Sequence, residues 1–167
     1  MSTFVLTAQD RRILTIEPYW RGFGYAVLEG SDRLIDWGLK ESRKEKHYHI
    51  LKKIGALLRH YNPDVVIVED VINSRRNPNT RDLMAAIVDM VQRENHTIAT
   101  IHRVTVKKVF GGATKAGIAQ KIAEHFPELT DWLPPVRKFW QTEDSKMNTF
   151  AAVANALAYY KVAEAEE

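Results

Sequence analysis

The chain has 167 residues, 45% of them hydrophobic and 27% charged, a composition that excludes disordered and fibrous proteins. The formal net charge of +3, from 24 Lys and Arg against 21 Asp and Glu, is too small to indicate a polyanionic partner by itself. The absence of cysteine excludes disulfides and thiolate metal sites, and no apolar run approaches the ~18 residues of a membrane span. We expect one cytoplasmic domain over residues 1–167, with flexible ends at 1–11 and 163–167.

The hydrophobic pattern predicts an α/β protein. In chain order, the predicted elements are strands at 12–17, 22–30 and 33–41, a helix at 44–61, a strand at 65–70, a helix around 83–91, a strand at 97–104, a helix at 115–125 and a last helix from 142 to about 162. Three strands in a row predict an antiparallel meander, and the alternation that follows predicts parallel strands. The sequence therefore predicts a five-stranded mixed sheet flanked by helices.

Acidic residues end two of the predicted strands. Glu17 ends "RILTIE" and is followed by Pro18, and Glu69 and Asp70 end "VVIVED". Ligands of α/β sheets bind beyond the carboxyl ends of strands, so these acids would meet if the strands are neighbours. Facing carboxylates repel one another, and Mg²⁺ or Mn²⁺ would relieve the repulsion. We expect Glu17 and Glu69 to bind metal, although either acid alone would also be explained by solvation or by pairing with Arg21.

The last predicted helix offers one more acid. At roughly 100° per residue, Asp144, Asn148, Ala151 and Asn155 lie on one stripe of this helix. Asp144 is therefore a candidate third metal ligand and, like Asp70, a candidate to complete a catalytic site. The alternative is that Asp144 only complements the helix dipole from the first turn.

Three basic segments are predicted in connections near the same edge of the sheet. Their cations are Arg75, Arg76 and Arg81, then Lys107, Lys108 and Lys115, then Arg137 and Lys138. The third segment, "PPVRKFW", also carries Phe139 and Trp140, and cations interleaved with aromatic rings suit phosphate contacts and base stacking. Each segment alone would also be explained as ordinary solvated surface. Together they predict a nucleic-acid-binding edge.

Several segments resemble the RuvC-like Holliday junction resolvases of the ribonuclease H-like superfamily. "ILTIEPYWRGFGYAVLEG" is similar to the first hairpin of that family, in which a strand ends in Asp-Pro. "PDVVIVEDVINSRRNPNTRDLMAAIV" is similar to its fourth strand, catalytic Glu and following helix, and "VTVKKVFGGATKAGIAQKI" and "FAAVANALAYY" resemble later segments. The resemblance implies a ribonuclease H-like fold, a Mg²⁺ (or Mn²⁺) cofactor, branched DNA as a partner and a homodimer.

The departures from the family pattern fall at the catalytic positions. Glu17 stands where the family has its first Asp, and Glu69 matches the second acid. Ala152 and Asn155 stand where the closing helix of the family carries Asp. Two hypotheses follow: a metal-dependent endonuclease for branched or structured DNA, in which Asp70, Asp144 or Glu143 completes the site, or a catalytically degenerate nucleic-acid-binding or scaffolding protein.

Overall fold

A computed structural model describes residues 7–43, 46–70 and 76–167 of the chain. Its elements are η1 (Ala8–Asp10), β1 (Arg12–Tyr19), β2 (Gly22–Glu29), β3 (Leu34–Glu41), α1 (Lys46–Tyr61), β4 (Val65–Glu69), α2 (Pro78–Arg93), β5 (Ile98–Ile101), α3 (Arg103–Val109), α4 (Lys115–His125), η2 (Pro127–Trp132) and α5 (Met147–Ala165). Within the described ranges, no helix has the length and apolar character needed to cross a membrane.

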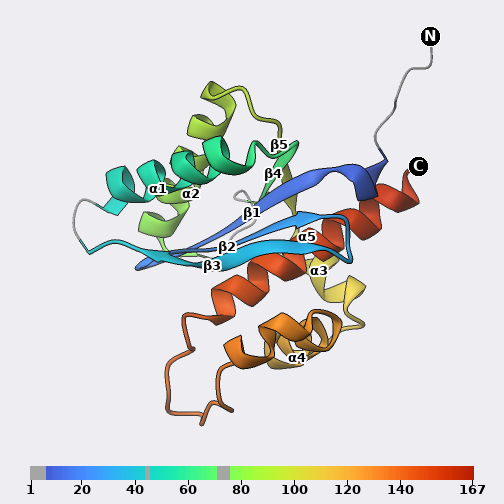
Figure 1. Cartoon of the computed structure of the whole chain (residues 1–167). Coiled ribbons are helices and arrows are strands. Elements are labelled where there is room, and N and C mark those ends of the chain that lie inside the picture. The colour runs from blue at the N-terminus through green and yellow to red at the C-terminus, as the bar shows by residue number, and fades with distance from the viewer. Residues whose placement is uncertain (1–6, 44–45, 71–75) are drawn as a thin grey trace.

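The five strands form one mixed sheet in the order β3-β2-β1-β4-β5 (Figure 1). β1, β2 and β3 are antiparallel neighbours, whereas β4 pairs parallel with β1 and β5 pairs parallel with β4. This confirms the predicted meander followed by parallel strands. It also makes β1 and β4 neighbours, which is the condition for the acids at their ends to meet.

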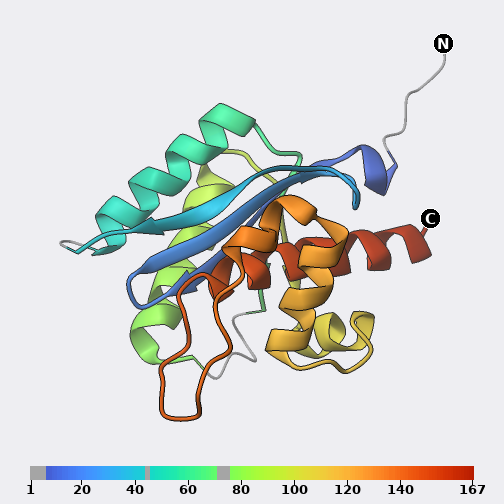
Figure 2. The same ribbon diagram turned by 60° about the horizontal axis from the view of Figure 1, so that its bottom comes forward.

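Helices cover both faces of the sheet. α1 and α2 lie on one face, and α5, with α3 and α4 outside it, lies on the other (Figures 1 and 2). Side chains alternate between the faces along a strand, so Ile13 packs in the cluster on the α5 side, whereas Leu14 and Ile16 pack on the α1 and α2 side. β1 is therefore buried on both faces, as a central strand requires.

α5 is held close against the sheet by small residues and side-chain hydrogen bonds. A Cβ built on Gly24 of β2 would lie 2.4 Å from the backbone carbon of Asn148, so only glycine permits this approach. The Thr149 hydroxyl donates to the Gly38 carbonyl at 2.8 Å, and the Thr15 hydroxyl donates to the Ala152 carbonyl at 2.7 Å. These contacts fix the start of α5 above the carboxyl end of β1.

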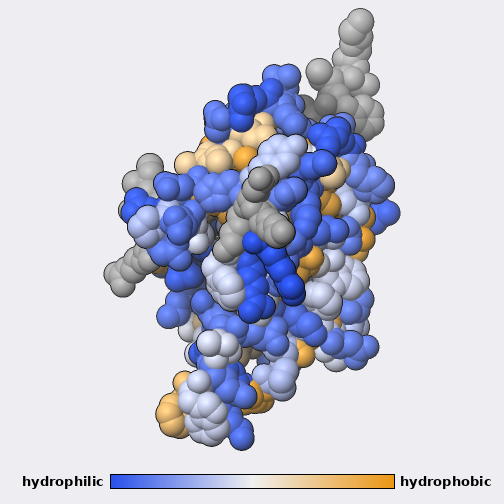
Figure 3. Space-filling model, turned by 90° about the vertical axis from the view of Figure 1, so that its left-hand side faces the viewer, coloured by the Kyte–Doolittle hydropathy of each residue, from blue (hydrophilic) through white to orange (hydrophobic). Residues whose placement is uncertain are grey.

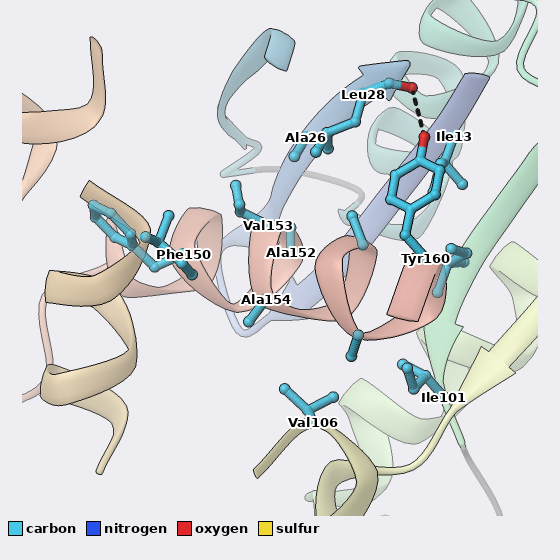
Figure 4. Close-up of a cluster of buried hydrophobic side chains, with 14 of the residues drawn as sticks. Ile13, Ala26, Leu28, Ile101, Val106, Phe150, Ala152, Val153, Ala154 and Tyr160 are labelled. Atoms are coloured by element: carbon cyan, nitrogen blue, oxygen red, sulfur yellow. Dashed lines mark hydrogen bonds between the residues drawn. The ribbon is translucent and has the colours of Figure 1, made fainter. Parts of the chain in front are cut away.

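Tyr160 anchors the other end of α5. Its ring is fully buried, and its hydroxyl donates to the Arg11 carbonyl at 2.7 Å while accepting from the Gly30 amide at 2.8 Å. The same hydroxyl lies 3.3 Å from the Leu28 carbonyl, the contact dashed in Figure 4. The surrounding cluster of buried hydrophobic side chains forms the core on this face of the sheet (Figure 4).

The last helix starts later than predicted. We expected it from residue 142, but α5 begins at Met147. The Asp144 carboxylate accepts a hydrogen bond from the Lys146 amide at 2.9 Å, and such local side-chain bonds compete with helix formation. Glu143 and Asp144 therefore lie in the loop before α5 and not in its first turn.

Two further boundaries differ from the prediction. The strand expected at 97–104 ends at Ile101, because the His102 ring caps a separate helix, α3, by accepting from the Val104 amide at 3.1 Å. β1, expected to end at Glu17, continues to Tyr19, because Pro18 and Tyr19 still pair with β2. The predicted bounds of α4 are confirmed, and the Thr114 hydroxyl caps its start by accepting from the Gly117 amide at 3.1 Å.

Candidate functional site

Glu17 and Glu69 lie on the same face of the sheet, near the carboxyl ends of adjacent strands: Glu69 is the last residue of β4, and Glu17 lies two residues before the end of β1. The last register pair between β1 and β4 is Thr15 with Ile67. Two residues further along each strand, the next positions on the α5 side are Glu17 and Glu69. Both residues are buried, with exposed fractions of 5% and 9%. The alternation of side chains along the strands and the parallel register together explain why the two carboxylates meet.

A guanidinium group lies between the two carboxylates. Nη2 of Arg76 contacts both Glu17 Oε1 and Glu69 Oε2, and Nε of Arg76 donates to Glu69 Oε2 at 2.9 Å. The remaining nitrogen, Nη1, donates to the Pro18 carbonyl at 2.7 Å. Arg76 immediately precedes Asn77, which caps α2 by accepting from the Thr80 amide at 2.9 Å. The start of α2 therefore fixes the backbone from which Arg76 reaches the acid pair.

The electrostatics of this cluster follow from burial and pairing. Burial raises the pKa of Glu17 above its ordinary value, and Arg76 opposes that rise while Glu69 adds to it. Burial alone would lower the pKa of Arg76, but the two carboxylates raise it above its ordinary value, so the guanidinium stays charged. Arg103, with Nε 3.6 Å from Glu69 Oε1, adds a more exposed second cation. Two arginines thus balance the two carboxylates.

Asn155 of α5 completes the cluster. Its amide nitrogen Nδ2 lies 3.4 Å from Glu17 Oε2 and donates a hydrogen bond to it. Asn155 is buried, so this amide is a fixed neutral neighbour of the acid pair. The cluster therefore consists of two carboxylates, a bridging guanidinium and an amide donor.

These residues do not fit a divalent metal site as they stand. A hard cation of this kind needs several anionic or carbonyl oxygens, but the guanidinium fills the position between the carboxylates and Asn155 presents its NH₂ group. Within residues 7–43, 46–70 and 76–167, no three His, Cys, Asp or Glu side chains gather in a way that could hold a metal ion. The negative charge of the acid pair is compensated from within the chain.

A cavity of about 270 Å³ adjoins the acid pair. Glu17, Glu69 and Asn155 lie among the residues that line it, and apolar side chains of α3, α4 and α5 form much of its wall. Arg103, Lys107 and Lys115 add positive charge to the lining. The cavity therefore combines an acidic end, an apolar wall and several cations contributed by α3 and α4.

The other predicted acids lie outside this cavity. Asp70 follows β4, is half-buried, and is absent from the cavity lining. Asp144 is exposed, and its carboxylate is used by the Lys146 amide. Glu143 does line the cavity, but its carboxylate pairs with Lys115 at 3.5 Å. The predicted stripe on the last helix is therefore present as Asn148, Ala151 and Asn155, and Asp144 is not part of it.

The predicted nucleic-acid-binding cations are distributed over several places. Lys107 and Lys115 lie at the cavity, whereas Lys108, Arg81, Arg137 and Lys138 are exposed on the surface away from its lining. Arg76 lies between the two glutamates, with only 17% of its side chain exposed. Arg75 lies outside the described residues.

Sequence reasoning missed Arg103 and the bridging position of Arg76. Arg103 lies within the strand predicted at 97–104, because the β-branched run Val104–Val106 favours a strand, whereas the structure starts α3 there with His102 as its cap. The pattern around Arg76 carried no signal for its partners, because Glu17 and Arg76 are 59 residues apart in the chain.

No protein-family model matches the chain, and no curated protein matches it by sequence. Solved structures that are similar to it include three Holliday junction resolvases. RuvC of Thermus thermophilus in complex with a Holliday junction substrate superimposes with a TM-score of 0.67 at 15% identity, over 91% of this chain and 94% of that one. The yeast mitochondrial Holliday junction resolvase Ydc2 gives 0.61 at 13% identity, over 94% and 81%. The fowlpox virus resolvase in complex with Holliday junction DNA gives 0.55 at 20% identity, over 90% and 97%. The chain therefore has the fold that these three resolvases share.

Proposed function

We propose that this protein binds branched or otherwise structured DNA and that its acid pair is held by Arg76 instead of by a divalent cation. Two of the similar structures, those of Thermus thermophilus RuvC and of the fowlpox virus resolvase, are complexes with Holliday junction DNA. Arg103, Lys107 and Lys115 beside the cavity supply the positive charge that phosphate contacts need. The shared fold and these cations support DNA as the ligand.

The observation that carries the proposal is the position of Arg76. Its guanidinium contacts both buried carboxylates, so the repulsion that would otherwise demand a metal ion is already relieved. Removing one partner of a buried ion pair strongly destabilises the folded protein, because the other charge is left buried without compensation. Arg76 therefore contributes to the stability of the fold. In this proposal the surrounding cations contact DNA directly, so binding does not depend on a metal ion.

A Mg²⁺-dependent endonuclease is the second candidate, and one specific observation favours it. Glu17 and Glu69 lie at the ends of neighbouring strands, beside a cavity with cations in its lining. In this candidate Arg76 would have to leave the carboxylates, and a further oxygen ligand would have to replace the Asn155 amide. A homodimer, as the resemblance to resolvases implies, is proposed for either candidate.

The two candidates are separated by measuring binding and cleavage in the same samples. Wild-type protein is titrated onto an immobile four-way junction and onto a duplex of the same length, first in EDTA and then in Mg²⁺ or Mn²⁺. We expect junction binding of similar affinity with and without metal, weaker duplex binding, and no strand cleavage. The Lys107→Ala variant should bind both DNAs more weakly, because phosphate contacts are independent of sequence.

Glu69→Gln tests the nuclease candidate, and Glu124→Gln is the matched control because Glu124 is an exposed glutamate of α4 that does not line the cavity. Cleavage that is lost in Glu69→Gln and kept in Glu124→Gln would overturn the non-catalytic proposal and establish the nuclease. Nicking that survives in both variants would come from a contaminating enzyme. Failure of wild-type protein to bind any branched DNA would contradict both candidates.

A further inference from the structure

The loop between η2 and α5 carries two large aromatic side chains that the fold does not use. Phe139 is 95% exposed and Trp140 is 66% exposed, and Val136 beside them is 94% exposed. Burying a ring of this size is among the larger favourable contributions to folding, so leaving two neighbouring rings in water requires a reason outside the core.

The loop holds both rings at the tip of a turn. The Gln141 amide donates to the Lys138 carbonyl at 2.9 Å, and the Lys138 amide donates to the Gln141 side-chain oxygen at 2.9 Å. Phe139 and Trp140 are the two residues between these bonded positions. Their rings meet edge to face, with centroids 5.1 Å apart and an interplanar angle of 85°. The tip therefore presents a defined pair of aromatic surfaces.

Positive charge accompanies the rings. Arg137 and Lys138 precede them directly and are exposed. The Lys138 ammonium lies 5.2 Å from the centroid of the Trp140 ring. Cations interleaved with exposed aromatic rings are the combination by which proteins hold single-stranded nucleic acid, since cations contact phosphates while every base has a face to stack.

The base of the loop is attached to the rim of the cavity beside the acid pair. Glu143, at the end of the loop, pairs with Lys115 at the start of α4, and both residues line that cavity. From there the loop projects away from the body of the protein, as Figure 2 shows. In the space-filling view it forms a narrow projection at the lower end of the molecule with hydrophobic surface on it (Figure 3). The loop therefore ends at the cavity whose cations are proposed to contact DNA.

We propose that Phe139 and Trp140 stack on unpaired bases of the bound DNA while Arg137 and Lys138 contact the flanking phosphates. This inference rests on the proposed function and adds the feature that is recognised: bases that are unpaired at a branch point or in a single-stranded segment. Trp140 offers the larger face, and Phe139 supports it from the side. Paired bases in a continuous duplex are already stacked on their neighbours, so the aromatic tip favours branched over linear DNA.

The test combines protein variants with a change in the DNA that removes bases and keeps phosphates. Affinity is measured for a duplex containing three unpaired thymines, for the same DNA with abasic sites at those positions, and for a fully paired duplex. Trp140→Ala should weaken binding to the thymine-containing DNA by about 10-fold or more, and leave binding to the paired duplex within about 2-fold. Val136→Ala, in the same loop, is the matched control and should bind as wild type does.

The abasic DNA gives the decisive comparison. Removing the bases should weaken wild-type binding at least as much as Trp140→Ala does, and Phe139→Ala/Trp140→Ala should bind the thymine-containing and abasic DNAs equally. Trp140→Phe, which keeps an aromatic face, should retain most of the affinity, whereas Trp140→Leu should not.

Two results would overturn stacking. Equal binding of Trp140→Ala and wild type to the thymine-containing DNA would exclude it, and full affinity in Trp140→Leu would make the tip a general apolar contact, as for a protein partner. In either case wild-type binding to branched DNA would persist, so the proposed function would stand. If the wild-type protein binds none of these DNAs, the proposed function itself is refuted.

Discussion

Asn155 donates a hydrogen bond to Glu17, with Nδ2 3.4 Å from Oε2, across 138 positions of the chain. The resemblance to resolvases would place a carboxylate at Asn155. A carboxylate there would repel Glu17, whereas the amide stabilises the ionised Glu17 as a donor. Together with Arg76, this amide makes the cluster a set of paired groups inside the protein.

We predict that Arg76→Ala strongly destabilises the fold. The substitution leaves Glu17 and Glu69 buried without their bridging cation, and breaking a buried ion pair in this way costs about 3–5 kcal/mol. Urea unfolding at neutral pH measures the change in the free energy of unfolding. Arg81→Ala, an exposed arginine in the same region of the chain, should change it by less than about 0.5 kcal/mol. Equal effects of the two variants would show that Arg76 does not hold the acid pair.

The double variant Arg76→Ala/Asn155→Asp should be more stable to unfolding in the presence of Mn²⁺ or Mg²⁺ than in its absence. It removes the guanidinium and adds a third carboxylate next to Glu17, which creates the oxygen-rich site that the natural chain lacks. At a metal concentration 100 times the Kd, linkage stabilises the folded state by about 2.7 kcal/mol.

Thermal unfolding with and without metal reports this gain. Arg76→Ala/Asn148→Asp is the matched control, because Asn148 lines the same cavity but bonds to the Ser145 carbonyl instead of to Glu17. The wild-type protein should show no comparable response. If metal stabilises the wild-type protein as much as it stabilises the double variant, a metal ion can displace the Arg76 guanidinium from the two carboxylates.

Glu17→Gln should change the dependence of stability on pH. Burial raises the pKa of Glu17 in the folded state, so the folded protein binds this proton more tightly than the unfolded chain does. The contribution of Glu17 to the free energy of unfolding therefore falls as the pH rises from about 4.5, the ordinary pKa of a glutamate, through the higher pKa that Glu17 has in the folded protein. Relative to wild type, Glu17→Gln should gain stability as the pH rises through that window. Urea unfolding at a series of pH values measures the difference, and parallel curves for the two proteins would contradict the raised pKa.

Gly24→Ala should displace α5 from the sheet. The new methyl group would lie 2.4 Å from the backbone carbon of Asn148 and 2.6 Å from the Thr149 amide nitrogen, and backbone atoms cannot move away as a flexible side chain would. We expect a loss of at least the ~1–3 kcal/mol typical of overpacking. Gly55→Ala is the matched control: its nearest neighbour is the end of the Arg59 side chain, and α1 should gain about 0.5–1 kcal/mol of helix propensity. Denaturant unfolding of both variants decides the point.

Lys107→Ala/Lys115→Ala should weaken binding to branched and linear DNA alike and reduce its dependence on salt. Each phosphate contact that is lost lowers the slope of log K against log salt by about 1. Lys52→Ala/Lys161→Ala removes the same charge from exposed lysines of α1 and α5 that do not line the cavity. Fluorescence anisotropy titrations at several salt concentrations compare the pairs. The same slope for both would show that charge anywhere on the surface serves equally well.

Local sequence patterns predict the five strands and most of the helices, although not α3 or the start of α5. β-branched and alternating runs mark the strands, helical spacing marks α1 and α2, and the order of these elements leaves few topologies that obey the rules of chain connection. The acids at the ends of β1 and β4 could be found in the same way, because their place depends on strand ends and side-chain alternation. These are local properties, visible within a few residues.

The group between those acids could not be predicted from local patterns. Arg76 is seven residues from Glu69 but 59 from Glu17, and nothing in the local pattern distinguishes an arginine that reaches inward from one that contacts solvent. Asp144 was misplaced for a related reason, since its own side-chain bond to the Lys146 amide delays the helix that was expected to carry it. Charge pairing across distant segments depends on three-dimensional distance and burial, which composition and periodicity do not contain.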